Sequence, residues 1–250
     1  MHYLILAAGK SSRIYSKIKK NKCLLNIKKE TLIKKAINNI LYFSKPEDKI
    51  HIVTGFKQNL IKKELSSKKL NFIHNKKYNS TEMLYSMMFA LNKIKKDNTI
   101  VIYSDIIFSK VVLNKLISLN SSNIIIPVLK NWKKVWNIKN KKIYDDAETL
   151  KINIQKNKVL EIGKKIKISK DIPKYQYMGI IYFPKNYIKK ILKIFKSNKD
   201  FKHMHLTNFI DYLINKKFDV SPIITTSHWY EFDDYEDYNN YLKNKNFINL

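Results

Sequence analysis

Short apolar, β-branched runs alternate with longer segments of helical period through the first half of the chain. The apolar runs occupy residues 4–8, 50–54, 70–74, 99–105 and 123–129, and the helical segments occupy residues 31–42, 58–65, 83–95 and 109–119. Each helical segment is long enough to cross the sheet and return to a parallel neighbour. This alternation predicts an α/β fold around a mostly parallel sheet.

The regularity ends near residue 130. Residues 149–155 and 158–162 predict a pair of antiparallel strands, and residues 177–183 predict a further strand of the sheet. Helices are expected at residues 185–196 and 206–216, a last strand at 219–224, and a terminal helix from Tyr235. A chain of 250 residues can form one sizeable domain with an appended lobe, and two independent domains are not expected.

Glycine is scarce in this chain. The four glycines are Gly9, Gly55, Gly163 and Gly179, and all fall at strand ends or in candidate site loops. We therefore expect each to occupy a position that needs a positive φ or a close backbone approach.

The formal net charge of +29 raises the alternative of a nucleic-acid-binding protein. The lysines, however, are spread along the chain together with abundant Asn and Ile, which is typical of an AT-rich genome, and no nucleic-acid-binding motif accompanies them. The sequence thus favours neither nucleic acid nor a membrane as partner. The positive field is expected to speed the arrival of anionic substrates.

The single cysteine, Cys23, excludes an intrachain disulfide and a four-cysteine zinc site. No stretch approaches the roughly 18 to 20 apolar residues of a membrane span, and the N-terminal residues lack the pattern of a signal peptide. These features predict a soluble, cytoplasmic protein.

The only arginine among 49 basic residues is Arg13, which follows the first apolar run. The small residues Ala7, Ala8 and Gly9 allow a tight turn whose free N–H groups, together with a following helix N-terminus, favour an anion. A guanidinium can bind phosphate oxygens in bidentate fashion, which lysine cannot. The loop therefore predicts a site for a polyphosphate.

Several motifs extend this observation along the chain. Residues 6–13 read LAAGKSSR and residues 21–25 read NKCLL, close to a pattern LAAGxGxR followed by PKxL, with Ser11 in place of the second glycine and Asn21 in place of the proline. Ser11 is expected to keep a helix-capping role. The later motifs are residues 53–56 (VTGF), 78–86 (YNSTEMLYS), 103–108 (YSDIIF), 145–150 (DDAETL), 161–164 (EIGK), 178–180 (MGI) and 229–234 (WYEFDD).

With these motifs the chain resembles, over nearly its whole length, the nucleotidyltransferases of the sugar-1-phosphate and phosphocholine cytidylyltransferase type. The resemblance implies a Rossmann-like, mostly parallel mixed sheet flanked by helices, the nucleotide-diphospho-sugar transferase type of fold, with a small inserted acceptor lobe. Residues 1–129 would form the nucleotide-binding core, residues 130–176 the acceptor lobe, and residues 177–250 the return to the core. The family usually carries two amides where this chain has Glu82 and Met83.

The resemblance also implies a set of nucleotide-binding residues. They are Leu6, Ala7, Ala8, Gly9, Lys10, Ser11, Ser12, Arg13, Lys22, Thr54, Gly55, Thr81, Glu82, Ser86, Ser104 and Asp105.

Nucleotidyl transfer explains these residue types, because the reaction depends on positioning and on neutralising charge rather than on a protein nucleophile. Lys22 would stabilise charge on the α-phosphate and, with Arg13, is a predicted catalytic residue. Lys10 would help Arg13 to hold the β- and γ-phosphates. Asp105 and Asp233 are the predicted ligands of Mg²⁺, which binds few carboxylates and keeps several waters.

Other roles remain open for these acids. Asp105 could be a helix N-cap, since aspartate commonly caps a helix after a strand. The acidic residues 231–237 could be a capping-rich start of the last helix, and the sequence does not decide between Asp233 and Asp234 as the ligand.

The acceptor site is predicted in the lobe. Aromatic rings and carboxylates can together bind an ammonium group, and the predicted residues are Trp132, Trp136, Tyr144, Asp146, Glu148, Lys164 and Gly179. The two tryptophans could instead be a hydrophobic staple between lobes, and Lys164 could be a solvated surface charge. His203 and His205 match a metal pair only in spacing, and we expect surface histidines.

These features predict a Mg²⁺-dependent cytidylyltransferase that transfers CMP from CTP to a small phosphorylated or phosphonylated acceptor and releases pyrophosphate. Phosphocholine, 2-aminoethylphosphonate and phosphorylated amino-acid-like compounds are the leading acceptors, and the product would serve surface glycan, capsule or lipid modification. One alternative is a sugar-1-phosphate nucleotidyltransferase using UTP or dTTP. The other is the nucleic-acid-binding protein considered above. A homodimer is compatible with the sequence.

Overall fold

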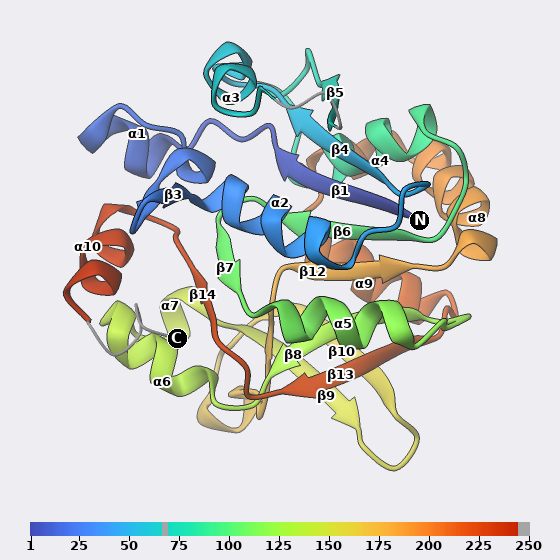
Figure 1. Cartoon of the computed structure of the whole chain (residues 1–250). Helices are drawn as coiled ribbons and strands as arrows, with labels where there is room; N and C mark the ends of the chain where they lie inside the picture. Colours follow the sequence, from blue (N-terminus) through green and yellow to red (C-terminus); the bar gives the residue numbers. More distant parts are fainter. Residues whose placement is uncertain (67–69, 245–250) are drawn as a thin grey trace.

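The computed structural model describes residues 1–66 and 70–244. A central sheet runs through the molecule and carries helices on both faces (Figure 1). In spatial order its strands are β11 (Gln176–Tyr177), β8 (Ile124–Leu129), β12 (Ile180–Phe183), β6 (Thr99–Tyr103), β1 (His2–Ala7), β4 (Lys49–Thr54) and β5 (Leu70–His74), and β13 (Val220–Thr225) pairs with β8.

The sheet is mixed, as predicted. The pairs β6/β1, β1/β4, β4/β5 and β8/β13 are parallel, whereas β12 is antiparallel to both β6 and β8, and β11 is antiparallel to β8. The carboxyl ends of β1, β4, β5 and β6 therefore meet at one edge, the place where open α/β sheets bind ligands.

Strand β1 lies at the centre and is buried on both faces, which explains its apolar run from Tyr3 to Ala7. Tyr3 and Ile5 point to one half of the core and Leu4 and Leu6 to the other. The first half includes residues of α1 (Ser12–Ile18), α2 (Leu32–Phe43), α3 (Gln58–Glu64), α5 (Lys110–Ser118), α6 (Trp132–Lys139) and α10 (Tyr235–Lys243). The second half includes α4 (Met83–Lys93), α8 (Lys185–Ser197) and α9 (Leu206–Asn215).

Smaller elements complete the fold. The predicted antiparallel pair after residue 148 is present as β9 (Glu148–Asn153) and β10 (Lys158–Lys165). Two further pairs are β7 (Ile106–Phe108) with β14 (Trp229–Glu231) and β2 (Asn26–Ile27) with β3 (Glu30–Thr31). The remaining helical turns are α7 (Ile143–Asp146), η1 (Lys22–Leu24), η2 (Ser169–Asp171) and η3 (Lys199–His203).

One strand prediction is wrong. Residues 177–183 do not form a single strand, because the chain changes partners between β11, which pairs with β8, and β12, which pairs mainly with β6. Gly179 lies at this break with φ +72°, a left-handed conformation that interrupts extended pairing. Gly163 also has a positive φ, +88°, as expected.

No helix in residues 1–66 and 70–244 is long and apolar enough to cross a membrane.

A buried histidine pair lies at the amino ends of β1 and β4. His2 Nδ1 and His51 Nε2 are 2.8 Å apart, so one ring donates a hydrogen bond to the other. Burial first, and then the charges of His2 and Lys49, lower the pKa of His51 from 6.5 to about 4. Burial lowers the pKa of His2 as well. The folded protein therefore favours both rings in the neutral form.

Acidification from pH 6.5 to pH 5 is expected to lower the free energy of unfolding by about 1–2 kcal/mol through His51 alone. The unfolded chain protonates this histidine below pH 6.5, whereas the folded chain does so only near pH 4. The stabilisation is thus complete above pH 6.5 and is lost as the pH falls towards 4. Urea unfolding at several pH values measures this slope. His51→Gln should flatten it, and the exposed control His203→Gln should not; equal slopes in both variants would contradict the prediction.

Candidate active site

The loop between β1 and α1 is shaped by Ser11. This residue has φ 56° and immediately precedes α1, but its side chain does not cap the helix, so the capping prediction is wrong. Its Oγ instead accepts a hydrogen bond from the backbone N–H of Lys22 at 2.9 Å. Ser11 thus holds Lys22 beside the loop.

Asn21 connects the segment around Lys22 to the loop that follows β4. Its side chain is 1% exposed, and Nδ2 donates to the Phe56 carbonyl oxygen at 3.0 Å. The backbone N–H of Phe56 in turn donates to the Ala8 carbonyl oxygen at 3.2 Å. The loops after β1 and β4 and the Lys22 segment therefore form one connected unit.

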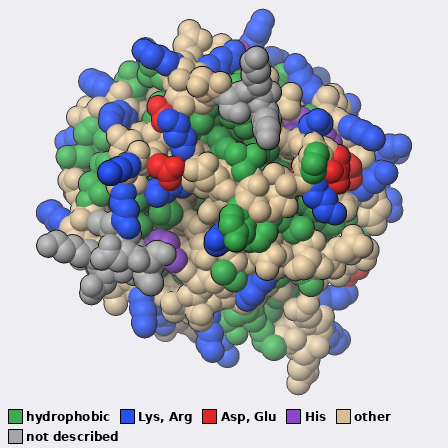
Figure 2. Space-filling model, in the orientation of Figure 1, with side chains coloured by type: hydrophobic (Ala, Val, Ile, Leu, Met, Phe, Trp, Pro, Cys, Tyr) green, Lys and Arg blue, Asp and Glu red, His purple; other side chains and the backbone are tan. Residues whose placement is uncertain are grey.

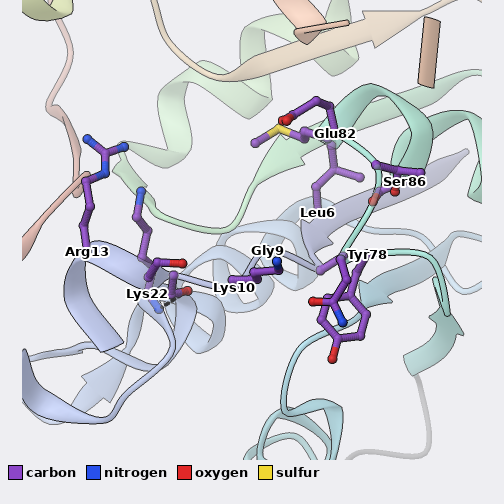
Figure 3. Close-up of a pocket in the computed structure, with 14 residues that line it drawn as sticks. Leu6, Gly9, Lys10, Arg13, Lys22, Tyr78, Glu82 and Ser86 are labelled. Carbon is purple, nitrogen blue, oxygen red and sulfur yellow. Dashed lines mark hydrogen bonds between the residues drawn. The ribbon is translucent and has the colours of Figure 1, made fainter. Parts of the chain in front are cut away.

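These loops surround a cavity of about 450 Å³, here named the loop cavity (Figure 3). Arg13 and Lys22 lie at one end of it, and Tyr78, Glu82 and Ser86 lie at the other. Of the predicted nucleotide-binding residues, Leu6, Ala8, Gly9, Lys10, Ser11, Ser12, Arg13, Lys22, Thr81, Glu82 and Ser86 line this cavity. Tyr78, Asn79 and Met83 also line it and were not among the predicted site residues.

The other predicted nucleotide-binding residues lie behind or beside the cavity wall. Ala7 and Thr54 are buried at the ends of β1 and β4, and Ser104 is buried after β6. Gly55 packs so closely that a Cβ would clash with the Ala8 carbonyl oxygen and the Tyr78 ring. These buried residues pack beneath the cavity wall and support the loops that form it. The remaining predicted residue, Asp105, belongs to a charged group at the end of β6.

Gly9 differs from the other glycines. It has no positive φ, and an added Cβ would meet no described atom within 4 Å, so the prediction that this position needs a positive φ or a close backbone approach is wrong for Gly9. Because Gly9 lines the loop cavity, the free space at its Cα lies beside the region predicted to hold phosphates.

We expect Gly9→Ala and Gly55→Ala to separate folding from binding. Gly55→Ala should destabilise the protein by about 1–3 kcal/mol, since a packed site must shift to admit a methyl group. Gly9→Ala should leave stability unchanged and weaken binding of the predicted nucleoside triphosphate, because the methyl group would compete with its phosphates. Thermal unfolding and calorimetric titration with CTP measure both effects. Unchanged CTP affinity in folded Gly9→Ala would argue against phosphate contact there.

A charged group joins the loop cavity to the carboxyl end of β6. Lys22 Nζ lies 3.2 Å from Asp105 Oδ2 and 3.5 Å from Asp233 Oδ1, and Arg13 Nη2 lies 3.7 Å from the same Asp233 oxygen. Pairing of β7 with β14, and a bond from Phe232 N–H to the Asp105 carbonyl oxygen at 3.0 Å, bring the two acids together. The structure thus brings the predicted catalytic cations and the predicted metal ligands into contact.

The charges of this group depend strongly on one another. Burial would lower the pKa of Lys22, but the Asp105 and Asp233 carboxylates outweigh it and raise this pKa above the ordinary value. Burial would raise the pKa of Asp233, but Lys139 and Lys22 hold it well below its usual range. Lys22 is therefore a cation and Asp233 an anion over a wide pH range.

Glu231 is a third acid of this group, and sequence reasoning missed it. Burial first, and then the Asp233 and Asp105 charges, raise the pKa of Glu231 well above its ordinary value. Its position two residues before Asp233, at the end of β14, was the available signal.

The structure decides between the alternative roles of the acids. Asp105 lies in the turn between β6 and β7 and precedes no helix, so the N-cap alternative is wrong for it. Asp234 is the N-cap of α10 and accepts a hydrogen bond from Asp237 N–H at 2.9 Å. Asp233 is therefore the acid that faces Lys22.

A divalent cation fits the donor set at Asp105 and Asp233. Asp105 Oδ1 is buried and accepts no hydrogen bond from the described residues, which leaves a carboxylate oxygen available to an ion. Among residues 1–66 and 70–244, no group of three or more His, Cys, Asp or Glu side chains is arranged to hold a metal. Two carboxylates with water and phosphate oxygens are the kind of site that Mg²⁺ takes.

A second cavity of about 330 Å³ adjoins the first and shares Arg13, Glu82 and Met83 with it. We name it the acidic cavity, because its carboxylates come from Glu82, Asp146, Glu148, Glu231 and Asp233. Predicted acceptor residues that line it are Trp136, Asp146, Glu148 and Gly179. Among the buried polar atoms of its lining, Trp136 Nε1 and Gln176 Oε1 have no hydrogen-bond partner in the described structure.

Three predicted acceptor residues lie elsewhere. Trp132 is 1% exposed and packs edge-on against Trp136, and its Nε1 donates a hydrogen bond to the Pro173 carbonyl oxygen at 3.2 Å. These contacts match the alternative role of a hydrophobic staple. Tyr144 is 50% exposed, and Lys164 Nζ pairs with Glu161 at 2.6 Å near α9. None of the three lines the acidic cavity, so their predicted contact with the acceptor is not supported.

His203 and His205 are both exposed, as expected, and His205 lines the acidic cavity.

A buried ion cluster behind Asp233 was not predicted. It comprises Lys139, Lys141, Asp146, Asp233, Asp234 and Asp237. The Lys139 side chain is fully buried, and although burial would lower its pKa, Asp233, Glu231 and Asp237 raise it above the ordinary value. Nothing in the sequence separates Lys139 from the other lysines.

Known proteins resemble this chain over most of its length. A family model for the MobA-like NTP transferase domain matches residues 3–167. The chain is similar to the CTP:phosphoglutamine cytidylyltransferase of Campylobacter jejuni subsp. jejuni serotype O:2, with 28% identity over 248 residues, 93% of this chain and 96% of that protein.

Two solved structures share the fold. The CTP:phosphocholine cytidylyltransferase from Streptococcus pneumoniae superposes with a TM-score of 0.75 at 18% identity, covering 97% of each chain. The inositol-1-phosphate CTP transferase from T. maritima superposes with a TM-score of 0.74 at 16% identity, covering 99% of this chain and 95% of that one. The predicted fold class is thereby confirmed.

Proposed function

Because the chain belongs to the family of MobA-like NTP transferase domains, we propose that it transfers CMP from CTP to a small phosphorylated or phosphonylated acceptor and releases pyrophosphate. Membership makes the chain a nucleotidyltransferase; the choice of CTP and of the acceptor class is the proposal. The observation that carries it is the junction of two cavities: Lys22 lines the loop cavity, Asp233 lines the acidic cavity, and Arg13 lines both.

The loop cavity suits the nucleotide. Lys10, Arg13 and Lys22 supply cations beside a turn of small residues, which favours a triphosphate. We assign Arg13 and Lys10 to the β- and γ-phosphates and Lys22 to the α-phosphate. Tyr78 and Ser86, at the opposite end of the cavity, are then available to the base (Figure 3).

The acidic cavity suits an acceptor that carries a cationic group as well as its phosphate. Carboxylates on several walls would repel an acceptor with only negative charge, whereas an ammonium group would be attracted. The lobe of residues 130–176 contributes Trp136, Asp146 and Glu148 to this cavity, which supports its assignment as the acceptor lobe.

In the proposed reaction an oxygen of the acceptor attacks the α-phosphorus of CTP, and pyrophosphate leaves in line. Lys22 stabilises the charge that develops at the α-phosphate, and Arg13 orients the departing pyrophosphate. Asp105 and Asp233 would hold Mg²⁺, which supplies charge neutralisation at the phosphates when bound. We further propose a cytoplasmic reaction whose product serves surface glycan, capsule or lipid modification.

The distribution of charge on the visible face does not favour the nucleic-acid-binding alternative. In Figure 2, lysines are scattered over the visible face instead of forming one continuous basic patch. A groove that follows a nucleic-acid backbone would need such a patch together with exposed aromatic residues.

A screen of substrates tests the proposal. Pyrophosphate release should be measured with each of the four ribonucleoside triphosphates and dTTP against phosphocholine, 2-aminoethylphosphonate, phosphoglutamine and glucose-1-phosphate. We expect turnover with CTP and one acceptor that carries an amino or quaternary ammonium group. Turnover only with UTP or dTTP and glucose-1-phosphate would replace the proposal by the sugar-nucleotide alternative. No turnover together with salt-sensitive RNA binding would favour the nucleic-acid alternative.

A further inference from the structure

We propose that Lys139 is a positioning residue for Asp233, and that it holds one carboxylate oxygen so that the other faces the metal and the phosphates. The inference rests on the proposed function in one respect, namely that Asp233 binds a divalent cation. Lys139 itself lies behind Asp233 and lines neither the loop cavity nor the acidic cavity.

The two oxygens of Asp233 have different partners. Lys139 Nζ contacts Oδ2 at 2.9 Å, whereas Lys22 Nζ and Arg13 Nη2 approach Oδ1 at 3.5 and 3.7 Å. The buried side therefore engages one oxygen and the cavity side the other. A carboxylate held in this way can offer a cation a single oxygen in a fixed direction.

Lys139 is itself firmly held. Its side chain is fully buried at the last residue of α6, and its ammonium also contacts Asp146 Oδ2 at 3.4 Å and Asp237 Oδ2 at 3.5 Å. Its carbonyl oxygen accepts a hydrogen bond from Asn240 Nδ2 of α10 at 3.1 Å. The three ammonium donors thus face three carboxylates, an arrangement that a buried charge needs.

The backbone of Asp233 is held from the same side. Its N–H donates to Asp237 Oδ2 at 2.7 Å, and Asp237 is itself fully buried. Side chain and backbone of Asp233 are thus both fixed to the junction of α6 and α10. Groups that orient a metal ligand in this manner commonly affect metal affinity about 10- to 100-fold.

Lys141 offers a matched comparison within the same cluster. Its Nζ pairs mainly with Asp237 at 2.9 Å and Asp234 at 3.1 Å, and approaches Asp233 Oδ2 only at 3.8 Å. It carries the same charge two residues away and is partly exposed. If only the net charge of the cluster affected metal binding, the loss of either lysine would have the same effect. If the orientation of Asp233 matters, the loss of Lys139 has the larger effect.

Binding of Mn²⁺ to the full chain, followed by the electron paramagnetic resonance signal of free Mn²⁺, tests the inference without turnover. We expect Lys139→Met to raise the dissociation constant of Mn²⁺ by about 10- to 100-fold. Lys141→Met should change it by less than about threefold, the scale of a screened, indirect charge effect. Equal effects of the two variants, or no effect of Lys139→Met, would overturn the proposal.

Removing a buried cation can also impair folding, so a second variant is needed. Lys139→Met combined with Asp237→Asn restores the charge balance of the cluster, and the asparagine can still accept the Asp233 N–H bond. Near-ultraviolet circular dichroism establishes that the variant is folded. Weakened Mn²⁺ binding in the folded double variant supports the proposal, whereas native affinity in it, or failure of both variants to fold, overturns it.

Asp233→Asn separates this inference from the proposed metal site. If the unmodified chain binds Mn²⁺ and Asp233→Asn binds it no less tightly, the metal assignment fails and the proposal fails with it. If Asp233→Asn weakens binding and Lys139→Met does not, only the role of Lys139 is wrong.

Discussion

Lys22→Met is expected to lower the turnover rate by about 10²- to 10³-fold, the effect of removing one preorganised group that stabilises transition-state charge. Lys22 is positioned by the bond from its N–H to Ser11 Oγ and by its contacts with Asp105 and Asp233. Methionine keeps the shape of the side chain and removes the charge. The rate of pyrophosphate release at saturating CTP and acceptor measures the effect.

The exposed Lys20 provides the control, since it lies near Lys22 in sequence and lines neither cavity. Lys20→Met should retain near-normal turnover. A comparable loss in both variants would indicate a general charge effect, and normal turnover in Lys22→Met would contradict its role at the α-phosphate.

Asp105→Asn is expected to lower turnover by about 10³-fold, because a bound divalent cation supplies several kcal/mol of charge stabilisation. The amide replaces a carboxylate of nearly the same shape, so the fold should persist. Its Oδ1 has no hydrogen-bond partner among the described residues, and a neutral amide is a weaker ligand for Mg²⁺ than a carboxylate. Turnover over a range of Mg²⁺ concentrations, together with thermal unfolding, measures the two effects separately.

Asp200→Asn is the matched control, since Asp200 is exposed at the start of η3 and lines neither cavity. It should keep normal turnover and normal Mg²⁺ dependence. If Asp105→Asn also kept both, the metal site would have to lie elsewhere.

Much of the fold could be predicted from local sequence. The apolar runs at the sheet centre are buried on both faces, so they lack polar residues and are easily distinguished from the amphipathic helices between them. The break at Gly179 was missed because the residues on both sides are apolar, and only the change of partner strand separates β11 from β12.

The site was predictable where its residues are contiguous. Residues 6–13 run from the end of β1 through the connecting loop to the start of α1, so a single sequence pattern includes most of the phosphate-side lining. The bond of Ser11 to Lys22 was not predictable, because a serine before a helix normally caps it and the alternative partner depends on how the second loop packs.

The charged residues behind the site depend on tertiary structure alone. Lys139 and Asp233 are 94 residues apart and come together only because α6 packs against the start of α10. In a chain with so many lysines, spacing gives no indication of which one is buried. Trp132 and Trp136 illustrate the same limit, since both were predicted to bind the acceptor but only Trp136 lines the acidic cavity.

The most direct test of CMP transfer uses CTP labelled with ³²P at either the α or the γ position, together with the acceptor that supports turnover in the screen. We predict that the α label appears in the acceptor product and the γ label only in pyrophosphate, in equal amounts. Transfer of the γ label to the acceptor, or release of labelled CMP without a labelled acceptor product, would contradict the proposed function.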